Sequence, residues 1–220
     1  MTQGHDRLQS SPTVRDHWWW RPGSRQGRRA FTFHVVFDGG TVDGAAKLHR
    51  LVREYQAAVS DLGGLDPVPV EWLHLTVQGV GFVDEVGEQA VDAVLAAARR
   101  RCAELAPFDL TFGRAIVSDE GIMLPGEPIG PAAALRGALR AGIGDVWGEA
   151  GVPEGEAFLP HVAVAYSSAN GSAARFVQAV EASAPPPATV TVRAASLIVI
   201  DRDARIYRWR PHAAVVLGQG

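Results

Sequence analysis

The chain has a single cysteine, no long run of apolar residues and little net charge, and each shortage excludes a class of protein. With Cys102 alone among 220 residues, no internal disulfide can form and no cysteine-based metal site is expected. No stretch approaches the ~20 apolar residues that cross a bilayer, and the polar first residues lack the apolar run of a signal peptide. We therefore expect no membrane segment, and the cytoplasm is the default location.

The charge balance is weak, because 24 acidic residues face 21 basic ones for a net charge of −3. Such a chain gives no sign of the broadly basic surface that binds long nucleic acids. A single nucleotide or RNA end stays compatible with it, since one phosphate needs only a local site. Apolar residues make up 47% of the sequence and charged residues 20%, which are globular values, and the length suffices for one large core or two small lobes.

The first thirty residues differ from the rest in being polar and without a sustained period. They contain three consecutive tryptophans, Trp18 to Trp20, which are too costly to leave in water. Three alternatives follow: the segment docks on its own domain, it is an aromatic lid that stacks a nucleobase, or it contacts a partner. We predict a flexible or docked arm over 1–30 and one bilobal domain over 31–220.

Beyond the arm, strands and helices alternate in an order that the second half of the chain repeats. Strands are expected over 31–37, 73–81, 108–117, 122–124, 161–166, 190–193, 195–201 and 206–209. Helices are expected over about 43–60, 84–102, 131–149 and 172–182, and loops over 63–69 and 151–160. This order favours an α+β fold of two pseudo-symmetric α/β lobes, interleaved in sequence, with largely antiparallel sheets facing a central cleft.

Two short apolar runs, half a chain apart, are each interrupted by one histidine, His74 in the first and His161 in the second. Because strand side chains alternate faces, Thr76 and Gln78 share the face of His74, and Ala163 shares that of His161. Either histidine alone is typical of an ordinary sheet residue. The pair in matching contexts predicts that both line a groove between the lobes.

Two imidazoles beside one groove are suited to acid–base chemistry without a metal. The reference pKa of ~6.5 allows one to be neutral and the other protonated near pH 7. Phosphodiester transfer needs that pairing, because a base takes a proton from water or a hydroxyl and an acid protonates the departing oxygen. Thr76, on the face of His74, can donate its hydroxyl to a phosphate oxygen.

The sequence His-Leu-Thr-Val at 74–77 matches the H-x-[ST]-x motif of the 2H phosphoesterase superfamily, which includes bacterial 2′-5′ RNA ligase-like proteins and 2′,3′-cyclic phosphodiesterases. The sequence His-Val-Ala-Val at 161–164 stands where a second copy belongs, and the order of elements over roughly 31–210 is similar to that of the family. The resemblance implies a bilobal, metal-independent enzyme without a cofactor, active on 2′,3′-cyclic phosphates or 2′-5′ linkages of RNA ends or nucleotides. It implies His74 and His161 as the catalytic pair and Thr76 as a phosphate-binding residue. We expect a monomer.

Ala163 departs from the family motif, because it stands where the second hydroxyl belongs. Losing one charge-assisted hydrogen bond to a phosphate costs about 1.5–3 kcal/mol. The alternative hypothesis is therefore a nucleotide- or RNA-binding module of the same fold with weak or no catalysis. A third is a member recruited to a small phosphorylated metabolite.

Another donor can replace the missing hydroxyl, and the candidates are Tyr166, Ser167, His34 or an arginine within 202–210. His34 lies opposite the apolar face of its strand, so it either faces the groove or is a plain structural histidine. Tyr166 reaches the groove only if its strand bends at Ala165. The remaining histidines lack a motif and are expected at the surface: His5, His17, His49 and His212.

Overall fold

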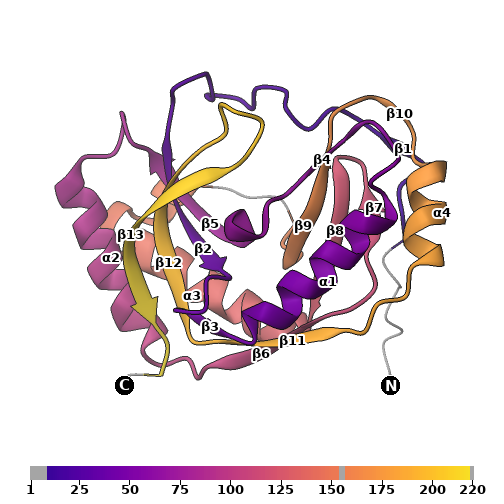
Figure 1. Ribbon diagram of the computed structural model, residues 1–220. Helices are drawn as coiled ribbons and strands as arrows, with labels where there is room; N and C mark the ends of the chain where they lie inside the picture. Colours follow the sequence, from indigo (N-terminus) through magenta and orange to yellow (C-terminus); the bar gives the residue numbers. More distant parts are fainter. Residues whose placement is uncertain (1–8, 154–156, 219–220) are drawn as a thin grey trace, which may run out of the picture.

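The computed structural model describes residues 9–153 and 157–218, and its strands form one main sheet in each of two lobes (Figure 1). The predicted α+β fold is confirmed, and the paired strands within the described residues run antiparallel. The first eight residues of the predicted arm, part of the loop over 151–160 and the last two residues lie outside the described residues.

Lobe one is a four-stranded sheet covered by two helices. Its strand order is β13-β12-β2-β5, and α2 and α3 pack against each other beside it. The bounds are β2 Ala30–Val36, β5 His74–Phe82, α2 Glu88–Cys102, α3 Ile129–Trp147, β12 Ala194–Asp201 and β13 Arg208–Val216. As the apolar periods predict, both helices bury one stripe, which includes Cys102.

Lobe two holds the larger sheet, in the order β3-β11-β6-β8-β9-β4, with β7 paired to β8. Helices α1 and α4 pack on this lobe (Figure 1). The bounds are β3 Val42–Asp43, α1 Ala45–Ala58, β4 Leu65–Pro67, β6 Phe108–Phe112, β7 Ile116–Ser118, β8 Gly121–Glu127, β9 His161–Ser167, α4 Ala174–Ala182 and β11 Ala188–Val192. Two single-turn 3₁₀ helices, Val70–Trp72 and Glu149–Gly151, lie in connections.

The lobes alternate along the chain and share one core. Buried side chains from both sheets belong to a single apolar cluster. Phe37, just after β2, meets Phe112 of β6 edge to face, with ring centroids 5.9 Å apart. The two sheets are therefore fixed relative to one another by packing.

The structure corrects three element predictions. The strand expected over 108–117 is two strands, because the chain breaks between β6 and β7, where the Ala115 N–H donates to the Tyr55 hydroxyl at 3.2 Å. The loop expected over 63–69 contains β4. The last strand runs to Val216, because Pro211 is tolerated on an edge strand beside a register shift.

The described part of the arm, residues 9–29, packs along the molecule, and we call it the strap. Its β1 (Thr13–Val14) pairs with β10 (Gly171–Ser172) on lobe two, and the strap then runs to the start of β2 in lobe one (Figure 1). Trp18 is half-buried, and its indole N–H donates to Asp66 at 2.8 Å. Trp19 and Trp20 remain exposed.

Among the described residues, no helix has the combination of length and apolar character needed to cross a bilayer.

Candidate active site

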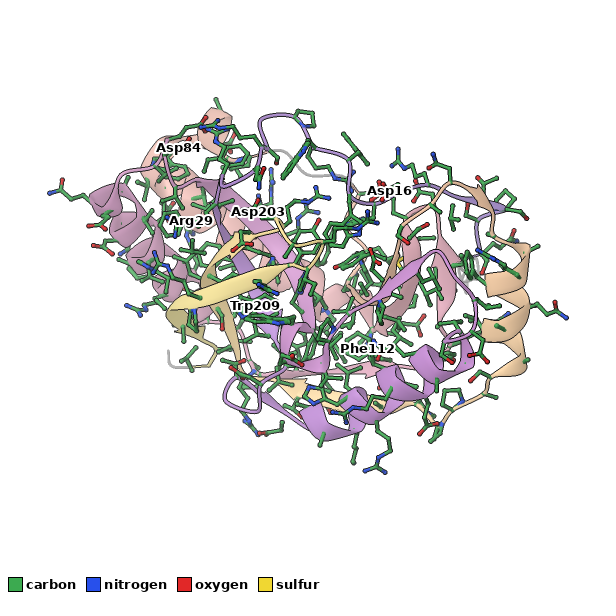
Figure 2. All side chains as sticks on the ribbon, turned by 45° about the horizontal axis from the view of Figure 1, so that its top comes forward. Asp16, Arg29, Asp84, Phe112, Asp203 and Trp209 are labelled. Carbon is green, nitrogen blue, oxygen red and sulfur yellow. The ribbon has the colours of Figure 1, made fainter. Side chains whose placement is uncertain are left out.

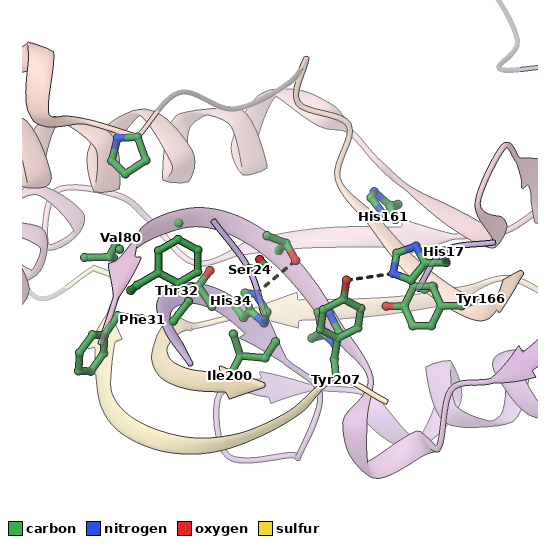
Figure 3. Close-up of a pocket in the computed structure, with 18 residues that line it drawn as sticks. His17, Ser24, Phe31, Thr32, His34, Val80, His161, Tyr166, Ile200 and Tyr207 are labelled. Atoms are coloured by element: carbon green, nitrogen blue, oxygen red, sulfur yellow. Dashed lines mark hydrogen bonds between the residues drawn. The ribbon is translucent and has the colours of Figure 1, made fainter. Parts of the chain in front are cut away.

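A cavity of about 470 Å³ receives side chains from both motif strands, β5 of lobe one and β9 of lobe two. His74 and Thr76 come from β5, and His161 and Ala163 from β9. At the other end the lining includes Phe31 and Val80, which lie away from His161 and Tyr166 (Figure 3). The cavity thus has a polar end, lined by histidine and tyrosine side chains, and an apolar end.

The two motif histidines are held in the same way. The Nδ1 atom of His74 lies 2.9 Å from the Trp72 carbonyl oxygen, and that of His161 lies 2.9 Å from the Leu159 carbonyl oxygen. A carbonyl oxygen only accepts, so each Nδ1 carries a proton. Each Nε2 is then left for the cavity, as acceptor when the ring is neutral and as donor when it is charged.

A bulge follows the first motif in β5. His34 and Phe33 are consecutive residues of β2, but they pair with Thr76 and Gln78, so Val77 is an extra residue. Directly paired residues share a face, so His34 and Thr76 lie together on the cavity side. Gln78 is turned to the face of Phe33.

Gln78 is therefore not a pocket residue, contrary to strict alternation. It is buried, and its side-chain oxygen accepts from the Arg136 Nε at 3.3 Å and from Arg140 at 3.2 Å, both on α3. Its amide nitrogen donates to the Pro153 carbonyl oxygen at 3.0 Å. Gln78 ties β5 to the helix behind it.

A matching bulge follows the second motif in β9. Ala163 and Ala165 pair with consecutive residues of β8, so Val164 is extra. The shift brings Tyr166 to the face of His161, and Tyr166 lines the cavity. Strict alternation allowed Tyr166 to reach the groove only if its strand bent at Ala165. The bulge at Val164 has the same effect.

His34 lies flat on His74, with ring centroids 4.6 Å apart and planes 6° from parallel. Its Nε2 is 3.2 Å from the Thr76 hydroxyl oxygen, while its buried Nδ1 has no hydrogen-bond partner among the described residues. Buried N–H groups without an acceptor are rare, so the tautomer with its proton on Nε2 is favoured. His34 then donates to Thr76, and the Thr76 hydroxyl proton is free to point into the cavity.

Burial keeps the stacked pair uncharged. It lowers the pKa of His74 to about 4, opposed by the hydrogen bond to Trp72 and assisted by charge on His161. Burial, together with charge on His74, holds the pKa of His34 well below its usual range. At neutral pH His74 is a neutral imidazole with a free Nε2 lone pair.

The wall beside Ala163 is completed by His17 of the strap. His17 stacks on Tyr166 at 4.1 Å between ring centroids. Its Nδ1 lies 2.9 Å from Glu120. Its Nε2 lies 2.9 Å from the Tyr207 hydroxyl (Figure 3). Partial burial acts to raise the pKa of Glu120, but hydrogen bonds from Arg21 and Trp19 outweigh it and lower that pKa to about 2.

The surface position expected for His17 is wrong, because this side chain is buried and burial lowers its pKa to about 4 despite the nearby Glu120. His212 is exposed and His49 is half-buried, while His5 lies outside the described residues. Two aromatic residues were missed, Tyr207 in the cavity wall and Trp209 edge-on to His74 at 5.2 Å. Both follow a turn in a short polar stretch, which gives no motif signal.

The other proposed substitutes for the missing hydroxyl do not line the cavity. Ser167 is buried, and its hydroxyl donates to the Ala169 carbonyl oxygen at 2.8 Å. Arg202 donates to the His17 carbonyl oxygen at 2.7 Å, and Arg205 contacts Asp66. Within the described ranges, no group of three or more His, Cys, Asp or Glu side chains is arranged to hold a metal ion.

The sequence model of the 2′-5′ RNA ligase superfamily matches residues 43–204, and the chain belongs to this family. The resemblance seen in the two histidine motifs is thereby confirmed. No curated protein matches the chain.

Solved structures share the fold at low identity. The protein TT0787 of Thermus thermophilus superposes with a TM-score of 0.64 at 21% identity, covering 87% of this chain and 98% of that one. Escherichia coli LigT in its apo form gives 0.62 at 20% identity, covering 87% and 99%. A further structure, described as a phosphoesterase, gives 0.59 at 19% identity with the same coverage. These matches show that the chain shares the fold of these proteins.

Proposed function

We propose that the protein is a metal-independent phosphoesterase that acts on 2′,3′-cyclic phosphate or 2′-5′ phosphodiester groups of nucleotides or RNA ends. The proposal is carried by two histidines from different lobes whose Nδ1 atoms are bonded alike and whose Nε2 atoms are left for one cavity. Membership of the 2′-5′ RNA ligase superfamily supports it. Escherichia coli LigT, which shares the fold, has been crystallised with 3′-AMP and with phosphate.

The burial of His74 assigns it the role of base, and the role of acid falls to His161. His74 is neutral at pH 7, so its Nε2 removes a proton from a water molecule as the water oxygen bonds to phosphorus. The bond from phosphorus to one ribose oxygen breaks, and His161 gives its Nε2 proton to that oxygen. The electron pair of the broken bond stays on the leaving oxygen. The proton on His74 later returns to solvent, and His161 takes up a proton from solvent for the next turnover.

Thr76 steadies the phosphate, and His34 positions Thr76. Because His34 donates from Nε2, the Thr76 hydroxyl has its own proton available for a non-bridging phosphate oxygen. His34 is thus a positioning residue that contacts no substrate in this scheme. Charge on His74 also disfavours charge on the stacked His34 ring.

Ala163 favours a second candidate function, a nucleotide-binding module of the same fold with weak chemistry. The β9 face offers the phosphate no hydroxyl at the position that matches Thr76. A donor worth about 1.5–3 kcal/mol is absent there, which would lower the rate while leaving the cavity able to bind.

The test measures hydrolysis of the four nucleoside 2′,3′-cyclic phosphates by the full chain with chelator present. Turnover that is lost in both His74→Ala and His161→Ala, with unchanged circular dichroism, is the expected result. The exposed His212→Ala serves as the matched histidine control. Tight binding of these compounds without turnover would instead establish the binding module.

A further inference from the structure

The strap lies outside the residues matched by the superfamily, and it links the two lobes. On lobe two it forms the β1–β10 pair. On lobe one the Arg28 side chain contacts Asp84 at 2.9 Å, and the Gly27 N–H donates to Asp203 at 3.0 Å. Asp16, Asp203 and Asp84 mark its course from one lobe to the other (Figure 2).

Two strap residues, His17 and Ser24, form part of the cavity wall. The His17 ring is fixed on three sides, by the stack on Tyr166 and by the bonds to Glu120 and Tyr207. The strap therefore forms an ordered part of the cavity wall. The volume that it helps to bound, about 470 Å³, lies in the lower half of the roughly 300–1,000 Å³ typical of small-molecule sites.

Four of the five strap arginines form ion pairs with the protein itself, and the fifth, Arg29, is exposed. RNA chains are held largely by arginine and lysine side chains that neutralise successive phosphates. Four strap arginines instead contact carboxylates of the two lobes: Arg15 with Asp119 and Glu120, Arg21 with Glu120, Arg25 with Asp84, and Arg28 with Asp84 and Glu85. These four arginines are thus engaged by carboxylates rather than held ready for a second phosphate.

We infer that the substrate is a single nucleotide carrying a cyclic phosphate rather than the end of an RNA chain, and that the strap imposes this limit. The inference rests on the proposed function of the cavity. The phosphate occupies the polar end and the nucleoside the apolar end, with the strap closing the wall beside Ala163. A second nucleotide would have to displace a segment anchored on both lobes.

The experiment compares kcat/KM of the full chain for adenosine 2′,3′-cyclic phosphate and for a triadenylate that ends in the same cyclic phosphate. The wild type is expected to favour the mononucleotide at least tenfold. Two variants loosen the strap outside the cavity, Trp18→Ala on the lobe-two side and Arg28→Ala on the lobe-one side. In each, the preference should fall at least fivefold, mainly through a gain on the trinucleotide.

Arg101→Ala is the matched control, because it removes the arginine–aspartate pair that Arg101 of α2 forms with Asp145 of α3 and leaves the strap intact. It should keep the wild-type ratio. Equal use of both substrates by the wild type overturns the inference, and so does an unchanged ratio in both strap variants that melt like the wild type.

Failure of the proposed function has a different signature, since the wild type would then hydrolyse neither substrate. In that case the same ratio is measured as Kd, with adenosine 2′-monophosphate and a triadenylate 2′-phosphate as probes. Tighter binding of the mononucleotide, lost in the strap variants, supports the size limit without catalysis. Equal or tighter binding of the trinucleotide overturns it.

Discussion

The two halves of the cavity are alike around their histidines and differ two residues later. His74 and His161 each bond a carbonyl oxygen two residues back at 2.9 Å, and each motif is followed by a one-residue bulge. The β5 half then offers Thr76, whereas the β9 half offers Ala163. What the halves share is set by backbone geometry, and what differs is a single hydroxyl group.

The groups that surround each histidine also come from different places. In the β5 half, His34 of the neighbouring strand stacks on His74 and bonds Thr76. In the β9 half, His17 of the strap stacks on Tyr166, next to Ala163. One half is thus completed within its own sheet, and the other by the strap, which belongs to neither main sheet. The strap therefore lies beside the motif that lacks a hydroxyl, at Ala163.

The largest effect is expected from substitutions that remove the histidine of either half. His74→Ala and His161→Ala should each lower kcat by about 10²–10⁴, because each deletes one partner of the acid–base pair. Steady-state kinetics on a cyclic nucleotide measures this, with His212→Ala as control. A loss confined to one variant would break the equivalence of the halves and leave the other histidine a structural role.

The next largest effects are expected in the β5 half, which carries the Thr76 hydroxyl. Thr76→Val keeps the side-chain shape and deletes the donor, so kcat/KM should fall about 10- to 100-fold, corresponding to about 1.5–3 kcal/mol. His34→Leu should give a smaller loss in kcat/KM, since Thr76 loses the contact with the His34 Nε2 atom that orients its hydroxyl. Wild-type kcat/KM in His34→Leu would reduce His34 to a packing role.

The histidines buried in the two halves predict a pH-dependent stability. His17 and His74 have a pKa of about 4 in the folded state and ~6.5 when unfolded, so the unfolded chain binds more protons between these values. Stability should therefore fall as pH drops from about 6.5 toward 5, by roughly 1.4 kcal/mol per unit for each histidine.

Urea unfolding at pH 7, 6 and 5 measures this slope. It should flatten in His17→Gln, and the exposed His212→Gln should leave it unchanged. Equal stability at pH 7 and 5 in the wild type contradicts the buried, neutral state of these rings. Glu120 adds little between pH 7 and 5, since both its ordinary pKa of 4.5 and its folded-state pKa of about 2 lie below this range.

The smallest effect is expected from equalising the halves. Ala163→Ser restores the hydroxyl that the second motif lacks, and kcat/KM should rise by up to about tenfold if a phosphate oxygen lies within reach. The gain is limited because His17 and Tyr166 already crowd that wall. An unchanged rate, with Thr76→Val still damaging, would show that the phosphate is held from the β5 side alone.

The sequence predicted the periodic parts of the fold well. Helices α1 to α4 follow their apolar stripes, and the strands β2, β5 and β9 follow their alternating or continuous apolar runs. It did not predict the break between β6 and β7 or the length of β13. Those depend on Tyr55 reaching from α1 and on the pairing of β12, contacts distant in sequence.

The two histidine motifs were legible in the sequence because strand alternation and the family pattern are local properties of a few residues. From these alone followed the proposed acid–base pair, the proposed role of Thr76 and the gap at Ala163. Tertiary structure decided the rest. Two bulges turned Gln78 away and Tyr166 inward, and a bulge depends on which strand pairs with which. His17 is buried because the strap, which has no periodic pattern of apolar residues, packs across both lobes. Such packing between residues distant in sequence leaves no periodic signal in the chain.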